Sequence, residues 1–214
     1  MASDHDSNRA PLVGVLALQG DFADHQSALA ACGLRTLQVR TPAQLRGVDA
    51  LVLPGGESTT MIRLLRVEGL WEPLRRALQS GVPVMATCAG LILLSQRVEQ
   101  PEQQSYGLLP LTVVRNGYGR QLHSGTFALS VESEALPDAL EGTFIRAPRI
   151  TAVHGACEVL ARREGDPVLV RKGSLLAACF HPELTVGHPV TRLFADAVRA
   201  SAATKAAAAV ADAV

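Results

Sequence analysis

Short apolar runs alternate with stretches of helical character through the first half of the chain. The apolar runs predict strands, and the segments between them predict helices. The expected strands cover residues 13–19, 34–40, 49–53 and 83–87, and the expected helices cover residues 21–31 and begin again at residue 58. The dipeptide Thr41-Pro42 predicts a short helix through a cap and a first-turn proline. Repeated strand–helix units form a parallel sheet that helices cover on both faces.

The second half of the chain carries shorter alternating segments. Runs such as residues 126–131 and 168–171 predict antiparallel strands. The sequence therefore predicts an α/β fold with a central, mostly parallel sheet, helices on both faces and added antiparallel strands. We expect one domain over residues 11–200, a disordered N-terminal extension at residues 1–10 and an alanine-rich tail at residues 201–214, which either extends the last helix or frays.

Composition excludes several classes of protein. With 214 residues and 48% hydrophobic content, the chain is large enough to bury the core of one α/β domain. The 20 basic residues balance 20 acidic residues, so neither a nucleic acid nor a membrane is expected as a partner. No apolar run reaches the length of a membrane span and the first residues are polar, so we expect a cytoplasmic protein. The 4 cysteines are far apart, which argues against a disulfide scaffold or a zinc site, and no metal or cofactor is expected.

Cys88 stands where a predicted strand meets a turn and then an apolar helix. This order is typical of a nucleophile elbow, in which a sharp turn holds a side chain clear of the sheet. The small residues Ala86 and Gly90 leave room for the turn, and the helix N-terminus favours a thiolate. A cysteine activated in this way indicates acyl transfer through a thioester. The alternative is that Cys88 is a small buried apolar residue, as free cysteines usually are.

A second segment, His181-Pro182-Glu183, offers the partners that a cysteine nucleophile requires. A histidine takes the proton of the thiol and later protonates the leaving amine, while a carboxylate orients the imidazole. On an extended chain His181 and Glu183 would point to the same face. Such pairs are also common on solvated loops, so this pair gains its significance from the elbow at Cys88.

A third segment runs from a strand into Gly55, Gly56 and the start of a helix. Its main-chain N–H groups, with that of Ala89 after the cysteine, are candidates for an oxyanion hole. The alternative is an ordinary strand-to-helix turn capped by Ser58 or Thr59. Ligands of parallel sheets bind beyond the carboxyl ends of the strands. Because this turn and the cysteine both follow such ends, we expect the two segments to meet.

Six stretches of the chain occur in the order and spacing of one known family. They are Gly14 to Gly20, Leu53 to Thr60, Thr87 to Leu91, Arg115 to Gln121, Phe144 to Pro148 and Phe180 to Leu184. Over residues 13–200 the chain resembles the glutaminase subunits of pyridoxal 5′-phosphate synthase, the PdxT/SNO family of triad-type (class I) glutamine amidotransferases. The resemblance implies a flavodoxin-like class I glutamine amidotransferase fold.

The resemblance also implies roles for individual residues. Cys88 would attack the side-chain amide of L-glutamine, His181 would shuttle the proton, and Glu183 would orient the histidine. The glutamine site would be lined by Gly56, Glu57, Ser58, Arg115, Ile145 and Arg146. An arginine can hold the glutamine carboxylate through two hydrogen bonds, but the sequence does not distinguish the two arginines. Taken without its motif, either arginine is better explained by a surface ion pair.

A lone glutaminase domain implies a partner, because ammonia released into water would be protonated and lost. By resemblance, the partner is the barrel-type pyridoxal 5′-phosphate synthase subunit in a hetero-oligomeric complex, and docking would complete the oxyanion hole. One residue departs from the family pattern, since Ala86 stands where glycine is usual. Alanine fits this turn if its φ stays negative.

Two other functions remain open. A cysteine hydrolase of the same fold would act on another amide and would need no partner that accepts ammonia. A non-catalytic regulatory subunit would keep the fold, although all three triad residues are present. Among the other histidines, His25 on the first helix is predicted to have a structural or partner-facing role. His123, His154 and His188 lack metal-ligand spacing and are expected to be solvated or satisfied in the core.

Overall fold

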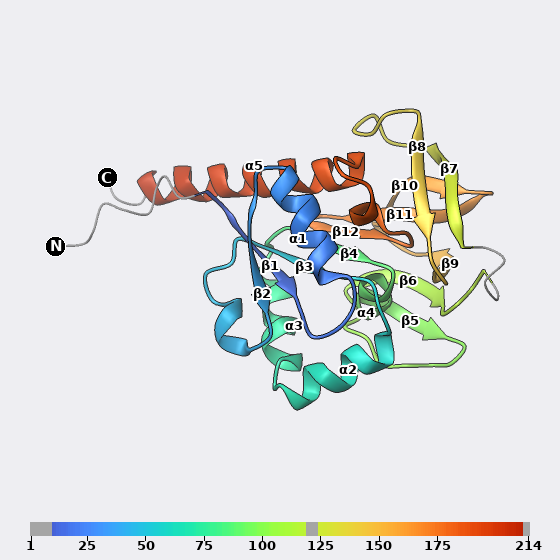
Figure 1. The fold of residues 1–214 in the computed structure, drawn as a ribbon, viewed down its shortest axis with the longest axis horizontal. Helices are drawn as coiled ribbons and strands as arrows, with labels where there is room; N and C mark the ends of the chain where they lie inside the picture. Colours follow the sequence, from blue (N-terminus) through green and yellow to red (C-terminus); the bar gives the residue numbers. More distant parts are fainter. Residues whose placement is uncertain (1–9, 119–123, 212–214) are drawn as a thin grey trace.

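The computed structural model describes residues 10–118 and 124–211, which form a nine-stranded sheet, a three-stranded sheet and surrounding helices (Figure 1). The strands are β1 (Leu12–Leu16), β2 (Arg35–Val39), β3 (Ala50–Leu53), β4 (Val84–Thr87), β5 (Ser95–Glu99), β6 (Leu109–Val114), β7 (Gly125–Val131), β8 (Leu140–Phe144), β9 (Arg149–Val153), β10 (Glu158–Arg163), β11 (Asp166–Lys172) and β12 (Leu175–Ala178). The α-helices are α1 (Phe22–Ala31), α2 (Ser58–Val67), α3 (Trp71–Gln79), α4 (Ala89–Leu94) and α5 (Pro189–Ala211), and short 3₁₀ helices form at η1 (Pro42–Leu45) and η2 (Pro182–Leu184).

The large sheet has a parallel half and an antiparallel half. Its order is β2-β1-β3-β4-β12-β11-β10-β7-β8, and the first five strands run parallel. β11, β10, β7 and β8 extend it through antiparallel pairs. The chain passes from β1 to β2 at the edge of the sheet and then returns past β1 to β3. Because such crossovers are right-handed, this change of direction places helices on opposite faces. Accordingly, α1 contacts α5 on one face of the sheet, whereas α2 contacts α3 and α4 on the other face (Figure 1). The α/β fold with added antiparallel strands is confirmed.

The predicted strands and helices of both halves are confirmed, with ends that differ by no more than three residues. Thr41 caps η1 in a capping box with Gln44, as the Thr41-Pro42 pair predicts. α5 continues without a break past residue 200 to Ala211, so the alanine-rich segment extends the helix as far as that residue. Residues 1–9 and 212–214, which include most of the expected N-terminal extension, lie outside the described residues. No helix in the described part of the chain is long and apolar enough to cross a membrane.

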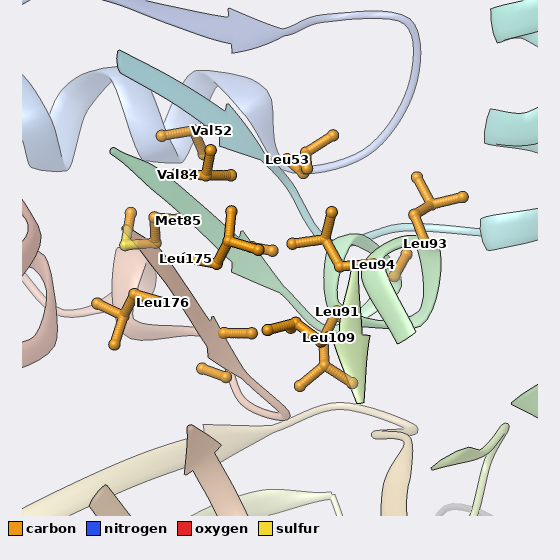
Figure 2. Close-up of a cluster of buried hydrophobic side chains, with 14 of the residues drawn as sticks. Val52, Leu53, Val84, Met85, Leu91, Leu93, Leu94, Leu109, Leu175 and Leu176 are labelled. Carbon is orange, nitrogen blue, oxygen red and sulfur yellow. The ribbon is translucent and has the colours of Figure 1, made fainter. Parts of the chain in front are cut away.

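The core lies where the central strands meet α4. Every residue of β3, β4 and β12 is buried, because both faces of these strands are covered. α4 has the sequence AGLILL and is also buried on all sides, as expected of a helix without a polar face. Figure 2 shows side chains of the strands, such as Val52, Val84 and Leu175, gathered beside Leu91 and Leu94 of α4. This packing fixes the carboxyl ends of β3, β4 and β12 relative to one another.

Candidate active site

The turn at Cys88 is strained in the way that a nucleophile elbow requires. Cys88 has φ 46° and ψ −101°, and its main-chain N–H donates to the carbonyl of Ala178 on β12 at 2.9 Å. The positive φ falls on Cys88 and not on Ala86, which stays within β4, so alanine fits this position. A Cβ atom at Gly90 would lie 2.1 Å from the main-chain oxygen of Leu53. Glycine therefore lets α4 rest directly on the end of β3.

His181 and Glu183 form a buried pair beside this elbow. Nδ1 of His181 lies 2.8 Å from Oε1 of Glu183, and both residues are buried. The expectation of an extended chain between them was wrong: His181 precedes η2, which begins at Pro182. Proline favours the first position of a helical turn because its φ is fixed and it needs no N–H partner there. The main-chain N–H of His181 donates to the carbonyl of Thr143 at 2.8 Å, which anchors the turn to the end of β8.

The electrostatics of the pair favour an imidazolium next to a carboxylate. Burial disfavours the charged form of His181, but hydrogen bonds with Cys88 and Glu183 outweigh it and raise the pKa of His181 to about 10. Burial also disfavours the charged form of Glu183, but hydrogen bonds and charge interactions with two histidines lower the pKa of this carboxyl to about 2. Since Glu183 occupies Nδ1, the other ring nitrogen of His181 is the one that can face the sulfur. The structure therefore brings together a hydrogen-bonded His181–Glu183 pair and the Cys88 thiol, whose interaction with His181 is among the causes of the raised pKa.

The glycine turn after β3 lies against His181, and the sequence predicts that this turn and the cysteine segment meet. A Cβ atom at Gly55 would lie 2.4 Å from Cε1 of His181, so only glycine allows the turn to pass so close. Gly56 has φ 139°, and a Cβ atom there would lie 2.6 Å from Oε1 of Gln19. The same Gln19 oxygen accepts the main-chain N–H of Glu57 at 2.8 Å. Ala89 begins α4 and is buried, so the three candidate oxyanion groups lie on the two turns that flank the histidine.

The cap of α2 differs from both residues proposed for it. The carboxylate of Glu57 accepts the N–H and hydroxyl of Thr59, at 3.1 and 2.6 Å. Ser58 is not the cap, because its hydroxyl is buried and donates to Oε1 of Gln103 at 3.0 Å. The start of α2 is thus held by a carboxylate that belongs to the predicted glutamine-site residues.

Arg115 pairs with a second residue of that predicted site. Its Nη2 lies 2.7 Å from Oε1 of Glu57, and the arginine side chain is 12% exposed while the carboxylate is 49% exposed. Burial works against ionisation of Glu57, but hydrogen bonds from Thr59 and the charge of Arg115 lower its pKa. An arginine that is mostly covered yet tied to an open carboxylate differs from an ordinary surface ion pair.

Ile145 and Arg146 follow β8 and are both exposed. Phe144 brings this segment toward the histidine, because its ring lies 5.6 Å from the ring of Phe180. Arg146 has φ 44°, and its N–H donates to the hydroxyl of Ser124 at 3.3 Å. The structure places the two residues near the end of β8 without a side-chain hydrogen bond to the triad in the described part of the chain. Gly119, Arg120, Gln121 and His123 lie outside the described residues.

Two residues near the triad were not predicted from the sequence. His25 is fully buried, with Nε2 at 3.0 Å from the hydroxyl of Thr87 and 3.3 Å from Oε1 of Glu183, so a partner-facing role is wrong. Oδ2 of Asp21 lies 3.4 Å from Nδ1 of His181. Both residues follow β1, another parallel strand whose carboxyl end lies at this edge. The rule that ligands bind beyond the carboxyl ends of parallel strands, which predicted the turns at Gly55 and Cys88, also indicates Asp21 and His25.

The remaining histidines and cysteines have ordinary surroundings. His188 is satisfied in the core, where it contacts the carbonyl of Glu141 at 2.8 Å and accepts the N–H of Val190 at 3.1 Å. His154 is exposed. The 4 cysteines are free, which agrees with the expected lack of a disulfide scaffold.

One group of side chains near the triad has metal-ligand geometry. Within the described residues, ligand atoms of Asp21, His181 and Glu183 lie within 4.8 Å of one another. Nδ1 of His181 is already bonded to Glu183, which fits an imidazole oriented for proton transfer. The absence of a metal cofactor stays a prediction.

Attack by a thiolate beside a histidine–carboxylate pair, at the carboxyl edge of this sheet, is the chemistry of the class I glutamine amidotransferases. A solved structure described as a glutamine amidotransferase matches with a TM-score of 0.80 and 42% identity, and covers 87% of this chain and 98% of that one. The chain itself belongs to the SNO glutamine amidotransferase family, whose model matches residues 15–200.

Relatives with curated names agree with this family. The pyridoxal 5′-phosphate synthase subunit PdxT of Streptomyces coelicolor is 48% identical over 198 residues, which cover 91% of this chain and 97% of the relative. The subunit of the same name from Frankia casuarinae is 50% identical over 193 residues, which cover 89% of this chain and 96% of the relative.

Proposed function

We propose that this chain hydrolyses L-glutamine to L-glutamate and ammonia, and delivers the ammonia to a barrel-type pyridoxal 5′-phosphate synthase subunit. The observation that carries the proposal is the buried His181–Glu183 pair, with its ring nitrogen and carboxylate oxygen 2.8 Å apart, beside the strained elbow at Cys88. The family and the names of the relatives support glutamine as the substrate and a synthase as the partner.

In the first half of the reaction, the thiolate of Cys88 attacks the side-chain carbonyl carbon of glutamine. The carbonyl oxygen becomes an oxyanion, and the N–H groups of Gly55, Gly56 and Ala89 are the proposed donors that stabilise it. The imidazolium of His181 then gives its proton to the nitrogen, the C–N bond breaks, and ammonia leaves behind a thioester. The raised pKa of His181 suits this step because the ring holds a proton before attack.

In the second half, the now neutral imidazole of His181 takes a proton from a water molecule that attacks the thioester. A second tetrahedral intermediate collapses, the C–S bond breaks, and glutamate leaves with the thiolate regenerated. Glu183 keeps its charge in both halves because its pKa is lowered to about 2, so it can stabilise the imidazolium each time that it forms.

Glutamine selection is assigned to the residues around the Glu57–Arg115 pair. The half-exposed carboxylate of Glu57 is positioned to accept the α-ammonium group, while Arg115 or Arg146 supplies donors for the α-carboxylate. Ser58 contributes main-chain groups, because its hydroxyl is engaged elsewhere. Gly56 provides the open backbone, and exposed Ile145 provides an apolar wall for the methylene groups of the substrate.

An exposed apolar surface beside the site supports docking of a partner. Ile145 and Leu184 are each 45% exposed and Val186 is 81% exposed; Ile145 is itself a predicted site residue, and the other two follow Glu183 in the sequence. Exposed apolar side chains around a polar site are typical of protein interfaces. A synthase subunit seated here would receive ammonia before it reaches bulk water. The cytoplasmic location also stays a prediction.

The proposal is tested by glutamate release from L-glutamine in the presence of the barrel-type synthase subunit. We expect partner-dependent release from the wild type and none from Cys88→Ala. Cys157→Ala is the matched control, because burial raises the pKa of this other half-buried thiol and it lies outside the proposed machinery. No release from the intact chain with an active partner would contradict the proposal. Release that does not need the partner, or that prefers another amide, would favour a different cysteine hydrolase.

A further inference from the structure

His25 lies behind the triad, on the helix that follows β1. Its ring is fully buried, and Nε2 lies between two oxygen atoms, the hydroxyl of Thr87 at 3.0 Å and Oε1 of Glu183 at 3.3 Å. Thr87 is the residue before Cys88, and Glu183 is the carboxylate on His181. One imidazole nitrogen therefore contacts both the side chain of the residue before the nucleophile and the carboxylate of the triad.

The surroundings of His25 select one tautomer of its ring. Nδ1 is buried and has no hydrogen-bond partner within residues 10–118 and 124–211. A proton on Nδ1 would be a buried donor without an acceptor, and Nε2 would then turn a lone pair toward the carboxylate of Glu183. A proton on Nε2 leaves only a neutral acceptor unsatisfied and points N–H at two oxygens. Burial of an unsatisfied donor and repulsion from a carboxylate both cost free energy, so the Nε2–H form is favoured.

We propose that His25 is a positioning residue of the glutaminase site, whose Nε2–H holds the Glu183 carboxylate against His181 and links it to Thr87. This inference rests on the proposed function for its kinetic consequence. Oε1 of Glu183 is then shared between two imidazoles, with Nδ1 of His181 at 2.8 Å and Nε2 of His25 at 3.3 Å. Oε2 has no partner in the described part of the chain, so these two contacts fix the orientation of the carboxylate.

The charged groups around His25 are few. α1 packs against β1, β2, α5 and η2. The η2 turn contributes Glu183 with its partner His181, and Asp21 precedes α1 and reaches His181 at 3.4 Å. β1 and β4 carry no titratable side chain. The charged residues of α1 itself, β2 and α5 are exposed: Asp24, Arg35, Arg192, Asp196, Arg199 and Lys205. Glu183 is therefore the group through which a change at His25 acts, and His25 is among the causes of its lowered pKa.

The test compares His25→Gln with His25→Asn in the holo-complex with the synthase subunit. The amide nitrogen of glutamine can take the place of Nε2. The asparagine side chain is shorter, so its amide nitrogen falls near the position of Nδ1. We expect kcat of His25→Asn to fall by between about 10-fold and about 100-fold, since a catalytic group misplaced by about 1 Å can cost about 100-fold. His25→Gln should regain most of this loss. KM for glutamine should change little in either variant.

The pH profile separates positioning from a merely structural role. Without the donor at residue 25, the pKa of Glu183 rises, so the acid limb of kcat/KM moves to higher pH in His25→Asn and returns in His25→Gln. Equal activity of the two variants, or a uniform loss with an unmoved acid limb, would overturn the proposal. A melting temperature near that of the wild type for both variants ensures that folded proteins are compared.

A second measurement needs neither glutamine nor the partner. Nitrogen-15 NMR of the histidine rings should show a proton on Nε2 of His25. An Nδ1–H tautomer would overturn the proposal even if both variants fold poorly. If the wild-type complex released no glutamate, the proposed function would fail, while the tautomer would still decide whether Nε2 of His25 carries the proton that the proposed contact with Glu183 requires.

Discussion

Gly55→Ala tests whether the glycine turn must share space with the catalytic histidine. A Cβ atom at this position would lie 2.4 Å from Cε1 of His181 and 2.9 Å from Oδ2 of Asp21, whereas ordinary contacts begin at 3.4 Å. The methyl group and the imidazole must therefore separate by about 1 Å. A displacement of about 1 Å costs about 100-fold in rate, which is about 2.7 kcal/mol of activation free energy. We expect kcat of Gly55→Ala to fall by about this factor.

The assay is glutamate release at saturating glutamine with the synthase partner present. Gly81→Ala is the matched control, because Gly81 has φ 85° and no atom lies within 4 Å of an added Cβ atom. That variant bears the strain of a left-handed alanine, about 1–2 kcal/mol, at the opposite end of β4 from Cys88. It should melt at a lower temperature but keep the kcat of the wild type. A folded Gly55→Ala protein with the kcat of the wild type would refute the steric argument.

Three further predictions follow from the same geometry. Glu183→Gln keeps the shape of the side chain but removes its charge, so the pKa of His181 should fall from about 10 and kcat should drop. Because the pKa of Glu183 is lowered to about 2, its stabilising effect is complete above its ordinary value of 4.5 and is lost as the pH falls toward 2. In urea unfolding, the wild type should lose this part of its stability at low pH and Glu183→Gln should not. An equal loss in both proteins would contradict the lowered pKa of Glu183. Arg115→Ala and Arg146→Ala test which arginine binds the carboxylate of glutamine. The variant that lacks this arginine should have a KM for glutamine about 10- to 100-fold higher, because a charged hydrogen bond contributes about 1.5–3 kcal/mol. An unchanged KM in both variants would exclude both arginines. Gly90→Ala should destabilise the fold by about 1–3 kcal/mol, since its Cβ atom would lie 2.1 Å from a main-chain oxygen of β3, and an unchanged urea midpoint would count against that packing.

Local patterns predicted most of the fold because burial on both faces leaves a plain signal. β3, β4 and β12 are continuous apolar runs, and the elbow at Cys88 follows from a strand, a small-residue turn and an apolar helix in succession. The same reasoning failed at the cap of α2. Whether Ser58 or Glu57 caps this helix depends on Gln103, which lies 45 residues away and takes the serine hydroxyl. No local pattern contains that information.

The prediction of an extended chain at Pro182 was wrong for a different reason. Two residues on either side of a proline can lie on an extended chain or on a helical turn, since φ near −65° suits both. The choice is made by the hydrogen bond from the His181 main chain to Thr143 and by the contact between Phe144 and Phe180. Both involve β8, which is distant in the sequence.

The sequence by itself determined which chemical groups follow the carboxyl ends of the strands, and parallel strands bring such ends to one edge of a sheet. The sequence alone therefore assigns a cysteine, a histidine–glutamate pair and a glycine turn to one site. Only the tertiary structure decided which other residues join them. Arg115 meets Glu57 across 58 positions and His25 meets Thr87 across 62. Contacts at such separations depend on how whole elements pack, and side-chain spacing within a single element carries no record of that packing.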